Sequence, residues 1–516
     1  MPKLRFILLS SFLALAACAQ NPARGGYEFT LASNGELRTM GDAAANAVLK
    51  SDGLYRPESN ATKYVDDLCN KIYATTEAAS DPVQCNLLDN GTFNAFATPG
   101  YLFVNRGLLP FISSEAELAA VLGHESGHLT ARHAMHSATQ QRIASAVLTG
   151  AMVAVGQSGA GYAASQAAST AGEQAAEIGL QTFSRAHETE ADALGRRYME
   201  RAGYDPHEAL NMVRAMGMVD AYQQAQSRAF GTANQSLLAH LKSSHPATPE
   251  RVAAALAATG EPPVVTPEKD LGRQRFMNAI EGLTFGPARR YGIARKAEIV
   301  LTHQRVAIPL PAGVITDYIT SGEQDKLGTW LVAHPQSGVY VRLTSLKVVA
   351  GRNPGTLVQN MLPLMHGDLM RIKIGTEVPT LNPQTITETT GYTATYHYLN
   401  DDHRYRVLTV SAPTRVDEML LLTVVYPSQD SFDKEDGNLM SILQKMKFLT
   451  EDQALKYKQL EVHTFIAATG DSVARQASRL PVGAMQEDLF RALNNLPTPA
   501  GMIPGQRYKT IVDLND

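Results

Sequence analysis

A filled H-E-x-x-H motif at residues 124–128 constrains this chain more than any other feature of its sequence. Residues four apart on an α-helix share a face, so His124 and His128 can present two imidazole nitrogens to one metal ion. Glu125 projects to the side of that pair, where its carboxylate can take a proton from a water molecule. The motif predicts a helical metal site in the chain, and a single zinc ion is the occupant that this pattern favours.

A motif this short also arises by chance, so the surrounding residues decide between a metal site and coincidence. Ser114 and Glu117 have the spacing of a capping box, which predicts that a helix begins there. Apolar residues then recur at helical spacing: Leu118, Val121, Leu122 and Leu129. The motif therefore lies on a predicted helix that buries one face.

A catalytic zinc site needs a third protein ligand, and several classes can be excluded. The metzincin pattern requires Gly at position 131 and His at 134, where this chain has Ala131 and Ala134. A carboxylate some twenty residues downstream is also excluded, because residues 130–171 contain no Asp or Glu. The next acidic residues are the candidates: Glu173, Glu177, Glu188, Glu190 and Asp192.

Glu188 and Asp192 have a helical spacing that suits the two tasks still open. Side chains four residues apart share a helix face, so Glu188 can reach the metal while Asp192 holds the other ring nitrogen of a ligating histidine. We therefore predict that Glu188 is the third ligand and that Asp192 holds a ligating histidine in orientation.

The two segments together, His124-Glu125-x-x-His128 and Ser184-Arg185-x-x-Glu188-x-x-Ala191-Asp192, resemble a known family. It is the metallopeptidase family of the CAAX prenyl proteases, the heat-shock protease HtpX and the mitochondrial Oma-type proteases. Residues 94–104 resemble the family's strand before the active-site helix, and Ser244-His245-Pro246 with Arg251 resembles its late His-Pro…Arg element. The matching segments span about residues 90 to 255.

The resemblance implies a zinc endopeptidase of the gluzincin type. It places His245 near the substrate carbonyl and gives Arg251 the task of organising the site around Asp192. In zincins an extended substrate can add to the open edge of the strand that borders the cleft. The residues that would line this edge are Asn94, Ala95, Phe96 and Ala97. The alternative is a buried strand with no contact to substrate.

Residues 1–17 have a charged start and a short apolar stretch, as in a signal peptide, and too few apolar residues to span a bilayer. Leu15-Ala16-Ala17-Cys18 resembles the lipobox of bacterial lipoproteins, which implies a lipid on Cys18. Similarity to Gram-negative sorting then implies a lipid-anchored periplasmic protein on the inner leaflet of the outer membrane. An ordinary secretory signal with a coincidental cysteine is the alternative.

With Cys18 lipidated, Cys69 and Cys85 remain. In an oxidising periplasm they can form a disulfide that closes a short loop. Two buried free thiols are the alternative, because spacing does not determine connectivity.

The sequence predicts an α+β protein. Residues 18–260 form a mainly helical zincin-type protease domain with a small substrate-edge sheet, and 261–290 a Pro-rich linker. Residues 291–450 alternate as strands do and contain an amphipathic helix over 438–448, which predicts an antiparallel α+β accessory domain. The tail, 451–516, either resembles part of a LysM glycan-binding module or completes the accessory domain.

Two features near the motif have open roles. Residues 137–176 are rich in small side chains and form either a mobile lid over the metal or a packed helical hairpin. His133 and His136 lie five and eight residues beyond His128 and turn off the metal face, so we expect them to be structural.

A net charge of −4 and the absence of a basic run argue against a nucleic-acid partner. The resemblance instead implies proteolysis of misfolded or unassembled envelope proteins, with peptidoglycan or outer-membrane assembly proteins as further candidate partners. The rival hypotheses are a non-proteolytic chaperone or scaffold, and an envelope-binding module that acts through the carboxy-terminal half.

Overall fold

The computed structural model describes a large part of the chain, in two compact units. The first unit contains residues 1–217 and 240–280, and the second contains 218–239 and 281–516. The described residues are 18–29, 34–136, 183–229, 251, 253, 256–257, 271–319, 328–347, 369–374, 389–396, 402–411 and 418–515. No helix within these ranges is both long and apolar enough to cross a membrane. The mixture of helices and sheets confirms the α+β class, whereas the predicted domain boundaries stay predictions.

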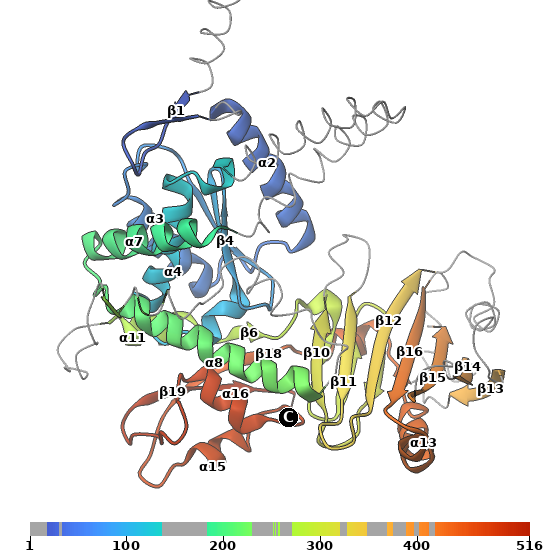
Figure 1. Ribbon diagram of the computed structural model, residues 1–516. Helices are drawn as coiled ribbons and strands as arrows, with labels where there is room; N and C mark the ends of the chain where they lie inside the picture. The colour runs from blue at the N-terminus through green and yellow to red at the C-terminus, as the bar shows by residue number, and fades with distance from the viewer. Residues whose placement is uncertain are drawn as a thin grey trace, which may run out of the picture. The chain divides into compact units, whose positions relative to one another are not determined.

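Helices make up most of the first unit (Figure 1). Its helices are α2 (Asn34–Ser51), α3 (Asn60–Tyr73), α4 (Glu115–Thr130), α7 (Arg185–Arg201), the first part of α8 (Glu208–Ala229) and α11 (Arg273–Ala279). Helix α3 begins at Ser59, whose side chain accepts a hydrogen bond from the backbone N–H of Thr62. Its buried residues repeat at helical spacing, so one face of α3 packs into the core: Ala61, Val65, Leu68, Cys69, Ile72 and Tyr73.

A three-stranded sheet of the first unit has the order β3-β5-β4. Its strands are β3 (Gln84–Leu88), β4 (Ala95–Thr98) and β5 (Tyr101–Asn105). Strands β4 and β5 form a hairpin within the region where the sequence predicts a strand, and Gly100 has the positive φ of 85° that its tight turn needs. Strand β3 runs parallel to β5 on its other side. This leaves β4 at an edge of the described sheet. A short pair, β1 (Cys18–Gln20) and β2 (Tyr27–Phe29), lies near the start of the chain.

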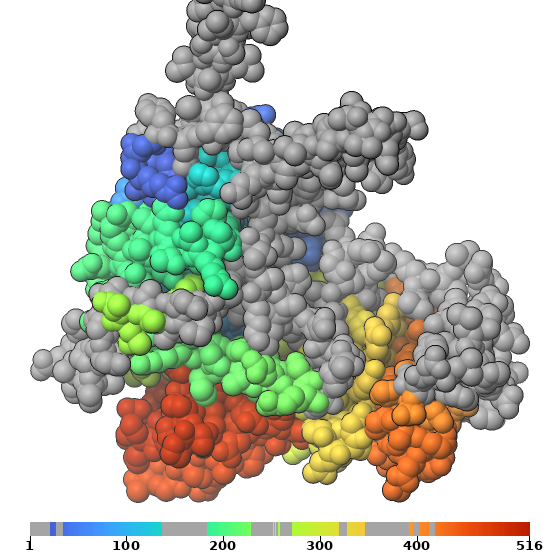
Figure 2. Space-filling model, in the orientation of Figure 1, coloured from blue at the N-terminus to red at the C-terminus, as the bar shows by residue number. Residues whose placement is uncertain are grey.

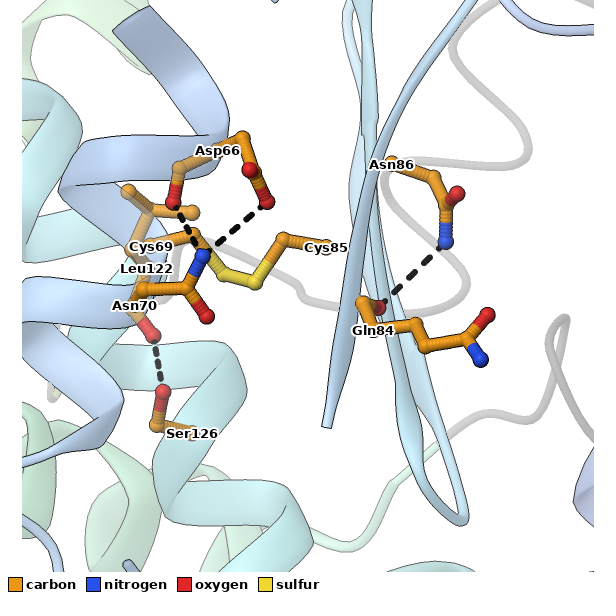
Figure 3. The surroundings of a disulfide bond; sticks show 8 residues. All are labelled: Asp66, Cys69, Asn70, Gln84, Cys85, Asn86, Leu122 and Ser126. Atoms are coloured by element: carbon orange, nitrogen blue, oxygen red, sulfur yellow. Dashed lines mark hydrogen bonds between the residues drawn. A yellow bond between two sulfur atoms is a disulfide. The ribbon is translucent and has the colours of Figure 1, made fainter. Parts of the chain in front are cut away.

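A disulfide between Cys69 and Cys85 joins helix α3 to strand β3 (Figure 3). Leu122 and Ser126 of α4 lie beside it in the same view. Cys69 is fully buried, so the bond lies against the core rather than on the surface. Of the two alternatives for these cysteines, the structure contains the disulfide.

The second unit is built largely from antiparallel strands. A seven-stranded sheet has the order β10-β11-β12-β16-β15-β14-β13, and a four-stranded sheet has the order β17-β9-β8-β7. The strands of these sheets are β7 (Ile293–Ala294), β8 (Glu298–Leu301), β9 (Val306–Pro309), β10 (Ile315–Ile319), β11 (Thr329–Ala333), β12 (Tyr340–Lys347), β13 (Leu369–Ile374), β14 (Thr389–Tyr396), β15 (Arg404–Ser411), β16 (Glu418–Tyr426) and β17 (Lys447–Phe448). Helix α13 (Gln429–Leu443) packs Leu439, Met440 and Leu443 into the same apolar core as β16.

The tail residues share a sheet with a segment just before the accessory strands. Strand β18 (Leu460–Ile466) pairs with β19 (Arg507–Val512) on one side and with β6 (Leu283–Phe285) on the other. Between β18 and β19 lie the short helices α15 (Val473–Ala477) and α16 (Gln486–Leu493). Figure 2 shows the tail, in red, as one continuous mass of side chains. This pairing supports the alternative in which the tail completes the accessory domain. Its partner β6 lies in the stretch that the sequence predicts as a linker.

Candidate metal centre

Helix α4 carries the H-E-x-x-H motif and begins where the sequence predicts. The Ser114 hydroxyl accepts a hydrogen bond from the backbone N–H of Glu117 at 3.1 Å. The Glu117 carboxylate reaches back to the N–H of Ser113 at 2.7 Å, one residue before the position that a capping box would use. The backbone N–H groups of Ser113 and Glu117 therefore both have hydrogen-bond acceptors, and these bonds fix the start of the helix in a buried position.

Helices α4 and α7 touch backbone to backbone and lie close together in Figure 1. A Cβ atom placed on Gly195 of α7 would lie 2.8 Å from the backbone nitrogen of His124. A Cβ atom on Gly123 would lie 2.8 Å from the Gly195 carbonyl oxygen, and one on Gly127 would lie 2.9 Å from that of Ala191. Only glycine permits this approach, and the approach lets a side chain as short as glutamate reach both histidines.

Donor atoms of three residues meet between the two helices. His124 Nε2 lies 3.0 Å from His128 Nε2, and the two Glu188 oxygens lie 3.5 Å and 3.3 Å from these nitrogens. Bonds of about 2.0–2.1 Å in a tetrahedral zinc site place neighbouring donors about 3.3 Å apart. Two imidazoles and a carboxylate at this spacing therefore suit a zinc ion, and the three residues can together hold a metal. The role of each as a ligand stays a prediction.

Asp192 and Arg251 lie beside this group, as the sequence and the resemblance predict. Asp192 Oδ1 lies 2.9 Å from His124 Nδ1, and Arg251 donates to both Asp192 oxygens at 2.8 Å and 2.7 Å. Arg251 also lies 2.9 Å from Glu188 Oε2. Burial alone would raise the pKa of the Asp192 carboxyl, but its hydrogen bonds with Arg251 and His124 hold that pKa well below its usual range. Asp192 is therefore an anionic acceptor that holds the His124 ring in place.

The same contacts affect the protonation of His124. Burial lowers the pKa of this imidazole, but the hydrogen bonds to Asp192 and Glu188 outweigh burial and raise the pKa to about 10. In the metal-free protein both ring nitrogens of His124 therefore carry a proton at neutral pH. A metal ion has to displace the proton on Nε2 in order to bind there.

His133 contacts His128, which the sequence does not predict. Its Nδ1 lies 2.9 Å from His128 Nδ1. Helix α4 ends at Thr130, and Arg132 has a positive φ of 56°, so the chain turns back instead of continuing the helix. Burial lowers the pKa of His133 to about 4, so its ring is neutral. An unrecognised left-handed residue is the reason that helical spacing misplaces this histidine.

The aromatic ring of Phe183 also contacts the site. It stacks on the His128 ring with the ring centres 4.1 Å apart. Phe183 stands directly before the N-cap residue of α7, Ser184. It therefore shields one face of the His128 imidazole from water, and no sequence pattern identifies this role.

An apolar pocket opens beside His124 and Glu125. Helix α8 supplies much of its apolar lining. Six large apolar residues of the lining are Phe93, Leu108, Val121, Met212, Val213 and Met216. Glu125 is 2% exposed, so its carboxylate is almost surrounded by protein where the pocket meets the metal site.

The remaining predicted residues differ in how far the structure describes them. Of the four edge residues, Asn94 precedes strand β4, and Ala95, Phe96 and Ala97 lie within it. Cys18 lies in β1. His245 and the small-residue segment 137–176 lie outside the described residues, so their proposed roles stay predictions.

Comparison with known proteins shows which proteins this part of the chain is similar to. Residues 59–259 match the model of peptidase family M48. The chain is 30% identical over 176 residues to the beta-barrel assembly-enhancing protease of Escherichia coli K12, and the match covers 34% of this chain and 36% of that protein. It is 30% identical over 177 residues to the mitochondrial metalloendopeptidase OMA1 of Schizosaccharomyces pombe, covering 34% and 49%. The chain thus spans a third to a half of these relatives, and the family match confirms the resemblance.

Proposed function

Because residues 59–259 match the model of peptidase family M48, we propose that the chain is a zinc-dependent endopeptidase. The observation that carries this proposal is the meeting of His124, His128 and Glu188 around one point, with Glu125 beside them. When bound there, zinc supplies a Lewis acid that activates water and polarises the scissile carbonyl. Asp192 and Arg251 keep His124 and Glu188 in orientation through the contacts described above.

In this proposal Glu125 is the general base. Its carboxylate takes a proton from the attacking water and passes it to the leaving amine. The nearly complete burial of this side chain favours proton transfer, because few competing water molecules surround it. His245, on the resemblance alone, is proposed to stabilise the negative charge that develops on the substrate carbonyl oxygen.

Substrate binding is proposed to use the edge of β4. Asn94 pairs with Asn105 through a backbone hydrogen bond, so in this antiparallel ladder Ala95 and Ala97 direct their N–H and C=O groups away from β5. These groups can pair with an extended peptide. Ala95 also lines the apolar pocket, so we propose that an apolar substrate side chain next to the scissile bond enters it. Unfolded proteins expose such residues in extended form.

The cell envelope is the proposed place of action. Residues 1–17 with Cys18 predict a lipid anchor on the inner leaflet of the outer membrane, facing the periplasm. A related protein bears the name beta-barrel assembly-enhancing protease, which supports misfolded or unassembled envelope proteins as substrates here. Outer-membrane assembly proteins, or peptidoglycan contacted by the tail, are proposed as further partners.

The test compares three forms of the protein, each starting at Ala19. Wild type is expected to carry about one zinc ion and to cleave casein. Glu125→Gln should keep the metal and lose cleavage, because it removes only the base, and Glu188→Ala should lose the metal.

The opposite result would be a wild type that binds zinc, never cleaves, and holds unfolded protein as well as Glu125→Gln does. That outcome would replace the peptidase by the chaperone or scaffold hypothesis. Retention of zinc by Glu188→Ala would instead reject the ligand set.

A further inference from the structure

The segment that follows Cys18 docks on the end of the metal-binding helix. The Asn21 side-chain amide donates to the Ala131 carbonyl at 3.0 Å, and the Ala23 N–H donates to the Thr130 carbonyl at 3.3 Å. Asn21 is 1% exposed, and its side-chain oxygen accepts from the N–H groups of Ala23 and Arg24 at 3.0 Å and 3.1 Å. Residues 21–24 therefore form a fixed turn that caps the last carbonyl groups of α4.

From this turn a line of side chains leads to the metal site. Arg24 grips the Glu190 carboxylate with two nitrogens, and its Nε lies 2.7 Å from Oε1. Glu190 Oε2 lies 3.1 Å from His133 Nε2. His133 Nδ1, on the other side of the same ring, lies 2.9 Å from His128 Nδ1. His133 is fully buried, so water does not replace these partners.

The carboxylate at one end determines the direction of every hydrogen bond in the line. An ionised Glu190 can only accept, so His133 Nε2 carries the hydrogen; a neutral imidazole has only one such hydrogen, so His133 Nδ1 is an acceptor. His128 must then carry its hydrogen on Nδ1. This leaves the lone pair on His128 Nε2, the atom that faces His124 and Glu188. Ligating histidines are commonly oriented in this way by a partner on the other ring nitrogen.

We propose that His133, Glu190 and Arg24 are positioning residues for His128, so that the turn after Cys18 is a working part of the metal site. This inference rests on the zinc site proposed above and extends it to the amino-terminal segment. Glu188 and Asp192 contact the two histidines directly from α7, while the new line connects the amino-terminal turn to His128 through Glu190 and His133. Loss of the line removes the acceptor that fixes the hydrogen on His128 Nδ1, so that hydrogen can move to Nε2, the nitrogen that faces the metal site.

The chain offers a matched control for Arg24. Arg201 forms an ion pair with Glu77, and the side-chain exposures of that pair are 46% and 27%. The corresponding exposures for Arg24 and Glu190 are 45% and 25%. Within the described part of the chain, neither Arg201 nor Glu77 forms a hydrogen bond or ion pair with a predicted ligand, and Arg201 lies on the same helix, α7, as Glu190. Arg201→Ala therefore removes an equally exposed ion pair without touching the line.

The experiment measures zinc affinity of the mature protein in detergent, by competition with a chromophoric chelator. Glu190→Ala and Arg24→Ala are expected to weaken zinc binding by about tenfold, within the 10- to 100-fold range of such supporting residues. Arg201→Ala should leave the affinity unchanged. Glu190→Gln keeps an acceptor oxygen for His133 and should recover much of the loss, as should Arg24→Lys. Thermal unfolding of the metal-free forms checks that each variant is folded.

The outcomes separate this inference from the proposed function. Zinc binding that needs Glu188 but is affected equally by Arg24→Ala and Arg201→Ala would overturn the positioning role alone. An equal loss in Glu190→Ala and Glu190→Gln would overturn the hydrogen-bond direction on which it depends. A wild type without zinc affinity would overturn both the inference and the proposed site.

Discussion

At the scale of single residues, Glu115 shows how one carboxylate fixes the start of α4. Tyr64 donates to it at 2.6 Å and Tyr204 at 2.8 Å, and Arg275 donates through two nitrogens at 3.1 Å and 3.0 Å. Burial alone would raise the pKa of this carboxyl, but the hydrogen bonds from Arg275, Tyr64 and Tyr204 lower it below the ordinary 4.5. The ionised form thus links α4 to α3 and α11.

Glu115→Gln is expected to reduce the free energy of unfolding by about 1–3 kcal/mol at neutral pH, because several charged hydrogen bonds are weakened. The folded-state pKa lies below 4.5, so the contribution is present above that pH and is lost as pH falls through the folded pKa. Urea unfolding at about pH 7 and about pH 3 measures the gap between wild type and variant. The gap should narrow at the acidic pH, and a constant gap would contradict this account.

At the scale of elements, the glycine contact between α4 and α7 determines the spacing of the predicted ligands. The atoms that a Cβ at Gly195 would meet are backbone atoms of Gly123 and His124, which cannot rotate away. Any side chain at this position must therefore separate the helices. The separation would move Glu188 and Asp192 on α7 from the two histidines on α4.

Gly195→Ala is expected to destabilise the protein by about 1–3 kcal/mol, the usual cost of overpacking, and to weaken zinc binding. Thermal unfolding with and without zinc measures both effects. The matched control is Gly217→Ala in α8, where a Cβ would meet nothing within 4 Å. That change should stabilise by about 0.5–1 kcal/mol, because alanine favours the helix. Equal stability and equal zinc binding of the two variants would show that the contact between α4 and α7 does not determine the spacing of the predicted ligands.

Local patterns predict elements well and their contacts poorly. The helix start at Ser114 can be predicted because cap residues act over a few positions. The helix predicted over 438–448 is instead α13, which ends at Leu443, while Lys447 and Phe448 form a strand with β9. Partners distant in sequence account for this difference, as they do for the pairing of β18 with β6.

The candidate site likewise has parts that local sequence patterns predict and parts that they do not. The grouping of His124, His128, Glu188 and Asp192 can be predicted because each pair shares a helix face. The contacts of His133 and Phe183 cannot, since they depend on how the chain turns after α4 and before α7. The apolar pocket depends on the placement of α8, which no short motif encodes.

At the scale of the whole molecule, the disulfide makes the stability of the protein depend on the compartment in which it folds. The bond between Cys69 and Cys85 closes a loop with a sequence separation of 16 and joins α3 to the sheet that contains the proposed substrate edge. Such bonds persist in oxidising compartments such as the periplasm. The chain therefore reaches its full stability only where this bond forms.

Replacing both cysteines by alanine is expected to lower the free energy of unfolding by about 3 kcal/mol, the value for a loop of similar length. Chemical unfolding with and without a reducing agent measures the effect. The reducing agent should lower the free energy of unfolding of wild type and leave that of the Cys69→Ala/Cys85→Ala variant unchanged. A wild type indifferent to reduction would show that the bond adds no stability.

The short turn at residues 21–24 also limits where the protein can work. Arg24 lies only six positions after Cys18, and a fully extended chain of that length spans at most about 20 Å. With the proposed lipid on Cys18, the end of the metal-binding helix stays within that distance of the bilayer surface. Substrates that remain attached to or lie near the same membrane would meet the enzyme by lateral diffusion in two dimensions. Their effective concentration at the site would far exceed that of a chain dispersed through the periplasmic volume.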